Sequence, residues 1–204
     1  HTLAEAYCNL IAASTSAGDW ERATEWCELV DEFARKHETA PLYGSCRTIH
    51  ADVLLATGRW DDAERALQSA LDVHARYVTQ LAAPTVAAMA ELRVRQNRLS
   101  EAELLLVGRE EHPESLRALA HLRLAQGRPA VAAALLERGL LAAEGDALKT
   151  AQLLAALVDA RIAEGEIGAA EATSRRLTEL ADESGIPVVT ARAASLAAIE
   201  PGDP

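Results

Sequence analysis

The sequence predicts an all-α protein in which helical hairpins stack into an α-solenoid. Half of the 204 residues are hydrophobic but only 3% are aromatic, and most of the apolar residues are Ala, Leu and Val. Small aliphatic residues of this kind favour closely packed helices over sheets. No segment alternates apolar and polar residues as a strand does. In addition, one sequence motif recurs along the chain. Its clearest copy is residues 56–71, ATGRWDDAERALQSAL.

Helical patterns follow one another along the chain with short breaks between them. In order they cover residues 3–16, 20–37, 42–57, 60–80, 84–97, 99–110, 114–127, 129–144, 147–164, 167–184 and 187–199. Four of these segments have a proline near their start, where the missing N–H breaks no helical hydrogen bond: Pro41, Pro84, Pro113 and Pro187. The pattern therefore predicts five hairpins followed by one C-terminal helix.

Each predicted hairpin turns at a residue that tolerates the left-handed conformation ending a helix. These turn residues are Gly18, Gly58, Asn97, Gly127 and Gly165. They are 40, 39, 30 and 38 residues apart, and this loose period is typical of stacked repeats.

Apolar residues recur at fixed offsets from these turns. Five residues after the turns stand Ala23, Ala63, Ala102, Ala132 and Ala170, and seven residues before them stand Ile11, Ala51, Ala90, Ala120 and Val158. Small residues on both sides of a turn indicate two helices that cross closely. Trp20 and Trp60 come two residues after their turns, where Leu99 and Ile167 serve later, so we expect both rings in the core.

The turn scheme resembles the tetratricopeptide repeat (TPR). It is best kept in IHADVLLATGRWDDAERALQSAL, through Ala51, Gly58, Ala63 and Ala70. The resemblance implies a right-handed α-solenoid of about five TPR-like hairpins plus a C-terminal helix, as a single domain over residues 1–204. Three of the four intervals exceed the family's length of about 34 residues, and the family's Trp near the start of the first helix is absent. The curvature of the standard TPR superhelix therefore cannot be assumed for this chain.

A narrower resemblance rests on DWERATEWCELVDEFARKHETAPLYGSCRTIHADVLLATGRWDDAERAL, AELRVRQNRLSEAELLL and AHLRLAQGRPAVAAALLERGL. These stretches are similar to the helical-repeat region of large LuxR-type, MalT-like bacterial transcription regulators, over most of residues 17–184. The resemblance implies a non-catalytic regulatory region that binds a protein partner, its own adjacent domains or an effector, while a separate domain binds DNA. Two alternatives stay open: a small-molecule effector sensor, and a stand-alone TPR scaffold or adaptor.

Charge and composition limit the classes of partner that this region is expected to bind and the compartment in which it is expected to occur. The net charge of −11 argues against nucleic-acid binding through this region, because such binding depends on neutralising phosphates. No apolar run approaches the ~20 residues that span a bilayer, and we expect no membrane association. The start HTLAEAYCNL has neither an initiator Met nor a signal pattern, so we expect the interior of a longer protein. Three cysteines without a CxxC predict no disulfide framework, which favours the cytoplasm.

No motif indicates catalysis or a cofactor. None of the eleven glycines precedes a Lys, which excludes a phosphate-binding loop, and HExxH, GxSxG and EF-hand patterns are absent. We therefore predict that the region is not an enzyme. Neighbouring helices could bring four potential metal ligands together: Cys8, Cys27, Cys46 and His50. However, only Cys46 and His50 have short ligand spacing, so we expect buried cysteines that fill gaps between helices.

Two further sets of residues are candidates for the surface. All seven aromatic residues precede residue 78, and of these Tyr7, Trp26 and Tyr43 are the freest to contribute to a binding surface. Arginines recur four residues before three turns, as Arg93, Arg123 and Arg161. Because acidic residues lie near the RVRQNR cluster, we expect a solvated face with local ion pairs and not a nucleic-acid patch.

The candidate binding face comes from the position six residues before each turn. It holds Ala12, Asp52, Glu91, His121 and Asp159, and in a TPR-like hairpin it lies on the first helix, toward the concave side. With the residues one turn earlier, the predicted groove comprises Thr48, Asp52, Glu91, Arg117, His121 and Asp159. The hypothesis is an acidic groove for a cationic peptide or a small polar effector, in which His121 makes binding sensitive to pH. The alternative is a solvated helix face.

Overall fold

The computed structural model describes residues 2–37, 41–77 and 82–197. Every regular element in these ranges is a helix, which confirms the predicted all-α class. The chain divides into two compact units, residues 1–107 and residues 108–204.

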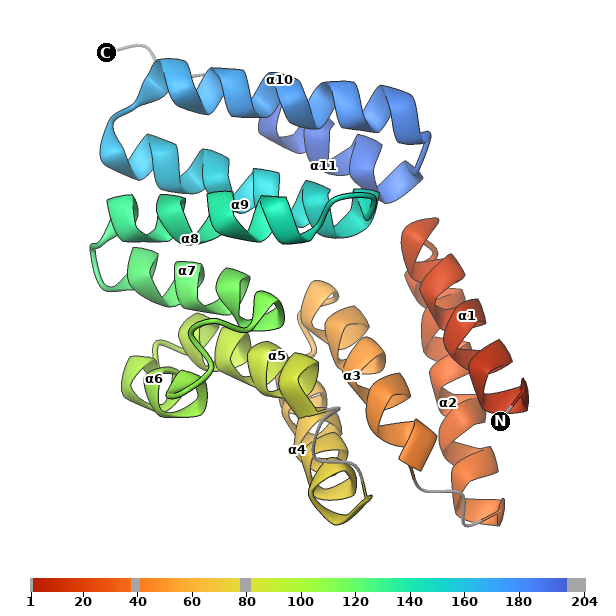
Figure 1. The fold of residues 1–204 in the computed structure, drawn as a ribbon. Helices are drawn as coiled ribbons and strands as arrows, with labels where there is room; N and C mark the ends of the chain where they lie inside the picture. The colour runs from red at the N-terminus through yellow and green to blue at the C-terminus, as the bar shows by residue number, and fades with distance from the viewer. Residues whose placement is uncertain (1, 38–40, 78–81, 198–204) are drawn as a thin grey trace. The chain divides into compact units, whose positions relative to one another are not determined.

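Unit 1 consists of three consecutive hairpins, α1–α2, α3–α4 and α5–α6 (Figure 1). Their helices are α1 Thr2–Ser16, α2 Trp20–His37, α3 Pro41–Ala56, α4 Trp60–Tyr77, α5 Ala82–Arg95 and α6 Leu99–Leu106. One apolar cluster lies in the first hairpin and α3, around Ile11 and Val30. A second cluster joins α3, α4 and α5 around Leu54, Leu67 and Leu92. The sides of these helices that face one another are thus the apolar sides.

Unit 2 contains two hairpins, α7–α8 and α9–α10, and the helix α11 that packs against α10 and α9 (Figure 1). Its elements are the 3-10 turn η2 Pro113–Ser115 and the helices α7 Leu116–Ala125, α8 Pro129–Ala142, α9 Ala147–Glu164, α10 Ile167–Ser184 and α11 Pro187–Ala197. One cluster centres on Leu136 and Leu157, and another on Leu154, Leu177 and Val189. Within the described residues, the predicted five hairpins and one further helix are therefore all present.

The five predicted turn residues share one backbone geometry. Their φ angles are all positive, at 73° for Gly18, 77° for Gly58, 58° for Asn97, 70° for Gly127 and 80° for Gly165. At each turn, that residue's N–H donates to the carbonyl three residues earlier, and the next N–H donates to the carbonyl five residues before itself. This pair of hydrogen bonds is the Schellman motif, which satisfies the last carbonyls of a helix. The sequence prediction of the turns is confirmed.

The apolar residues at fixed offsets are buried, as predicted. Ala23, Ala63, Ala102 and Ala132 are fully buried, and Ala170 nearly so. The residues seven positions before the turns are buried to the same degree. Because two helices of a hairpin meet at these positions, a methyl group there lets the backbones approach closely.

Most described helix boundaries lie within two residues of the prediction, and the largest difference is at the end of α6. Helix α6 ends at Leu106 rather than at residue 110, because Gly108 adopts a φ of 73°. A 3-10 turn precedes α7, which ends at Ala125. The predicted ends at residues 80 and 199 lie outside the described residues.

Candidate interaction surface

Thr48 does not line an open groove. Only 7% of its surface is exposed, and its Oγ1 donates to the Gly44 carbonyl oxygen at 3.0 Å. The same atom lies 2.7 Å from Oγ1 of Thr85, which is fully buried on α5. Thr48 therefore joins α3 to α5, and its assignment to a solvent-facing groove is corrected.

Asp52 and Glu91 occupy the same position relative to their turns but differ in burial. Asp52 is exposed on α3, whereas only 6% of the Glu91 surface on α5 is exposed. The reason is that α5 is buried at every residue from Thr85 to Arg93 and has no solvated face over that stretch. The expectation of an evenly solvated acidic row is therefore corrected at Glu91.

In unit 2 the predicted residues meet polar partners on the neighbouring first helix. Arg117 on α7 is half-buried, and its Nη1 donates to Oε1 of Gln152 on α9. His121 follows Arg117 by four residues, so both lie on one face of α7. Gln152 and Asp159 are seven residues apart, which places them on one face of α9.

Asp159 is flanked by positive groups from two other helices. Partial burial of its carboxyl group raises the pKa of Asp159 above its ordinary value, and the charges of His121 on α7 and Arg192 on α11 oppose that rise. Part of the Asp159 surface nevertheless remains accessible to solvent. The first helices α7 and α9 and the last helix α11 thus contribute to one set of polar residues, which we call the polar row: Arg117, His121, Gln152, Asp159 and Arg192.

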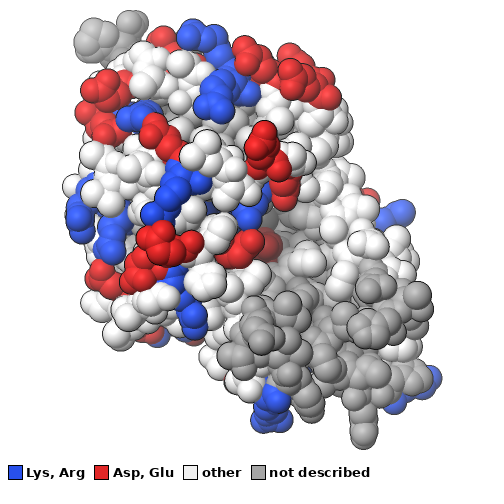
Figure 2. Space-filling view, in the orientation of Figure 1, with Lys and Arg blue, Asp and Glu red and all other residues white. Residues whose placement is uncertain are grey.

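The arginines that precede the turns form ion pairs between consecutive hairpins. Arg93 Nη2 on α5 lies 2.6 Å from Glu64 Oε1 on α4, and Arg161 on α9 pairs with Glu137 on α8. Hydrogen bonds from Arg93 and Gln96 lower the pKa of Glu64 to about 2, against a partial desolvation that raises it. The expected ion pairs are present for both arginines, but the expectation of a solvated face is wrong for Arg93, which is buried. Figure 2 shows charges of both signs interspersed over the visible part of unit 2.

Two of the three cysteines are bonded to each other. Cys8 on α1 and Cys46 on α3 form a disulfide with their Cα atoms 5.7 Å apart. Cys27 is buried and takes no part in that bond. This corrects the expectation that the cysteines only fill gaps, because an odd cysteine count still permits one bridge. Among the described residues, no group of three or more His, Cys, Asp or Glu side chains is placed to hold a metal ion.

The aromatic side chains depart from the prediction in both directions. Trp60 is 40% exposed, so its assignment to the core is wrong, and Trp20 is half-buried. The ring of Tyr7 lies 6.3 Å from that of Trp26 and 6.1 Å from that of Phe33. Tyr7 and Trp26 therefore pack against the apolar cluster of the first hairpin. The side chain of Tyr43 lies outside the described residues.

Some notable residues escaped the sequence reasoning. Gln152 lies two helical turns before Asp159, and a search along that face would have found it. Arg192 lies on α11, and the described residues contain no hairpin turn after it that would mark its position in the repeat. His74 is 1% exposed against Gly44, and burial lowers its pKa. No simple sequence signal indicates a histidine buried in this way.

Within the described residues, no helix combines the length and the apolar character needed to cross a membrane. No known family's sequence profile matches the chain. No curated protein matches it in sequence either.

Solved structures do match the fold. A protein described as a kinesin light chain of Podosopora anserina, with nearly identical TPR-like repeats, superposes with a TM-score of 0.54 at 18% identity. The match covers 88% of this chain and 95% of the other. A variant of the same protein gives a TM-score of 0.54 at 18% identity, over 89% and 95% of the two chains. The chain has the fold of TPR-like repeat proteins.

Proposed function

We propose that this chain is a non-catalytic TPR-like interaction region that binds a protein partner through the polar row of unit 2. The observation that carries the proposal is the linkage of α7, α9 and α11 by Arg117–Gln152 and by Asp159 with His121 and Arg192. Stacked helical repeats offer extended surfaces on their first helices. A row of polar groups there supplies hydrogen bonds and charge without requiring a deep apolar pocket.

The polar row favours a partner segment that carries both acids and hydrogen-bond donors. Arg117 and Arg192 attract carboxylates, whereas Asp159 attracts a basic side chain. Asp52 is exposed on α3 of unit 1 and is proposed as a separate acidic contact. Thr48 and Glu91 are buried and support the packing of α3 and α5, so we do not propose that they contact the partner.

The wider context is also a proposal. The resemblance to LuxR-type regulators supports a role in transcription regulation within a single repeat domain, with DNA bound by a domain outside residues 1–204. It also supports a cytoplasmic location, although a disulfide such as Cys8–Cys46 persists best in an oxidising compartment. Thiol labelling of the protein in fresh cell lysate distinguishes the two compartments. A helix-turn-helix encoded beyond Pro204 would support the regulator, and its absence would favour a stand-alone scaffold.

The interaction is tested with a variant that neutralises the polar row: His121→Gln, Asp159→Asn and Arg192→Gln. Partners captured by the parent chain are identified by mass spectrometry, and their binding is then measured directly with purified proteins. We expect the variant to bind at least tenfold more weakly, while its helical content by circular dichroism is unchanged.

The matched control changes Asp182→Asn and Arg175→Gln, two exposed residues of α10 outside the row. It should bind as the parent does. If the row variant binds the purified partner as tightly as the control, the partner does not use this surface. A thermal-shift screen of metabolites with the same variants tests the effector-sensor alternative.

A further inference from the structure

Unit 2 contains a pocket that lies apart from the polar row. It has a volume of about 470 Å³ and lies between the α8–α9 connection and α10. Its lining residues are Leu140, Leu141, Glu144, Asp146, Arg176 and Leu180, with Gly145, Ala147 and Thr150 between them. This volume falls in the range of small-ligand sites.

The elements that surround the pocket have defined local structure. Asp146 caps α9 by accepting a hydrogen bond from the Lys149 N–H at 3.0 Å. The Thr150 hydroxyl donates to the Ala143 carbonyl oxygen at 3.2 Å. Arg176 and Leu180 are four residues apart and therefore lie on one face of α10. Asp146 and Thr150 thus fix the start of α9 against the connection, which presents a defined wall to α10.

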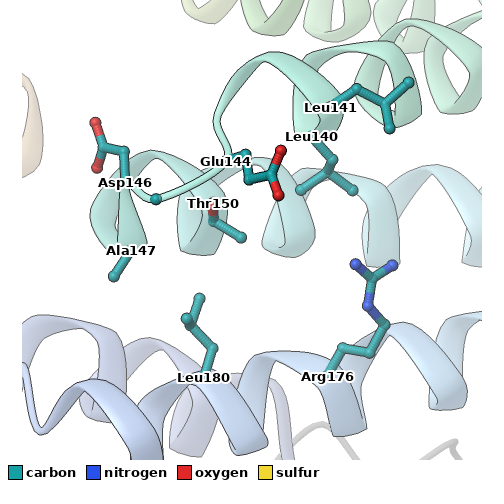
Figure 3. A pocket seen from close by; sticks show the side chains of 9 residues that line it. Leu140, Leu141, Glu144, Asp146, Ala147, Thr150, Arg176 and Leu180 are labelled. Atoms are coloured by element: carbon teal, nitrogen blue, oxygen red, sulfur yellow. The ribbon is translucent and has the colours of Figure 1, made fainter.

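The pocket combines an apolar floor with charges of both signs. Leu180 and Arg176 extend from α10 toward the connection, and Leu140 and Glu144 lie on the opposite side of the pocket (Figure 3). Leu141 is 80% exposed at the rim. Among the ion pairs within the described residues, none engages Glu144 or Arg176. An acid and a guanidinium therefore line one cavity together with leucines, without forming an ion pair with each other.

We propose that this pocket binds a short zwitterionic peptide of about dipeptide size with aliphatic side chains. Its ammonium group would lie at Glu144, its carboxylate at Arg176, and its side chains on Leu140 and Leu180. The two charged residues line one pocket together with leucines, which favours a ligand that carries two opposite charges and aliphatic side chains. A single amino acid carries both charged groups on one carbon atom and has only one side chain for the two leucines, so it fits less well. The site is independent of the polar row, so the two proposals fail or succeed separately.

The probe is L-leucyl-L-leucine, titrated into the isotope-labelled chain of residues 1–204 and followed by amide chemical shifts. We expect saturable shifts in residues 140–150 and 176–180. N-acetyl-leucyl-leucine amide lacks both charges and should bind at least tenfold more weakly, and free L-leucine should also bind more weakly. Glu144→Gln and Arg176→Gln should each weaken the dipeptide about threefold to fivefold, because both side chains are exposed.

Glu171→Gln and Arg175→Gln provide matched controls, since both residues are exposed on α10 and do not line the pocket. These variants should bind the dipeptide as the parent does. The proposal is overturned if no saturable shift occurs up to the solubility limit of the dipeptide. It is equally overturned if the uncharged peptide binds as tightly, or if Glu144→Gln and Arg176→Gln have no larger effect than the controls.

Discussion

At the scale of single residues, the turn positions show how backbone conformation selects the amino acid. Four of the five hairpin turns use Gly and one uses Asn97, all with positive φ. A Cβ added at Gly58 or Gly127 would meet no atom within 4 Å. Space is therefore available, and only the backbone conformation disfavours other residues.

The first prediction separates backbone strain from steric exclusion. Gly58→Ala should lower the free energy of unfolding by about 1–2 kcal/mol, since an L-residue is strained in the left-handed region. Gly168→Ala, in helix α10 and also with open space around it, should instead raise it by about 0.5–1 kcal/mol. Urea unfolding followed by circular dichroism measures both. Equal effects of the two substitutions would contradict the explanation.

The second prediction compares two positions of the α3–α4 hairpin. Ala63 is fully buried, so Ala63→Leu should overpack the helix crossing and cost about 1–3 kcal/mol. Trp60 is 40% exposed, so Trp60→Ala should cost about 2 kcal/mol, less than the about 3–5 kcal/mol of a buried ring. Urea unfolding decides the order of the two. A neutral Ala63→Leu variant would show that the helices do not cross closely there.

At the scale of helices, contacts between consecutive elements connect the hairpins. The Arg93–Glu64 pair joins α5 to α4, and Arg161–Glu137 repeats the arrangement between α9 and α8. The Cys8–Cys46 disulfide joins α1 to α3. The two ion pairs connect helices that follow each other in the chain, the disulfide connects α1 to the helix after the next, and each link can be removed individually.

The third prediction concerns the dependence of stability on pH. Glu64 has a pKa of about 2 in the fold and 4.5 ordinarily. Because the folded value is the lower one, its stabilisation is complete above about pH 4.5 and is lost as the pH falls toward 2. The difference in unfolding free energy between the parent and Glu64→Gln should shrink over that interval. A difference that stays constant with pH would exclude the ion pair as its cause.

The fourth prediction concerns the disulfide, which joins cysteines 38 residues apart. Reduction should lower the free energy of unfolding by about 3–4 kcal/mol, because a loop of this length gains much freedom in the unfolded chain. Unfolding with and without dithiothreitol measures the effect. Cys8→Ser serves as the control and should not respond to the reductant. If parent and control respond alike, the bridge does not form in solution.

At the scale of the whole molecule, the chain divides into two compact units, residues 1–107 and 108–204. The two apolar clusters of unit 2 lie wholly within residues 108–204. In repeat proteins, stability is approximately a sum of repeat and nearest-neighbour terms. If residues 1–204 form a single domain, as the sequence predicts, a fragment of one unit should not fold alone. If the two units are separable, it should.

The fifth prediction is that a fragment of residues 108–204 folds alone. It should be helical by circular dichroism and unfold cooperatively in urea, since α7–α11 bury their apolar faces against one another. The fragment should also retain the dipeptide pocket, whose residues all belong to unit 2. A disordered fragment would instead favour one indivisible domain.

The sequence alone determined the helices, the five turns and the buried alanines of this protein. These features depend on local rules: a turn needs a residue that accepts positive φ, and a close crossing at a fixed offset needs a small side chain. The tertiary structure alone decided which of several equivalent positions is solvated. Glu91 and Asp52 both stand six residues before their turns. Glu91 is buried because α5 is buried at every residue from Thr85 to Arg93, whereas α3 leaves Asp52 exposed. The tertiary structure also determined the Cys8–Cys46 disulfide and the pocket lined by Glu144 and Arg176. Both combine residues that are far apart in the sequence.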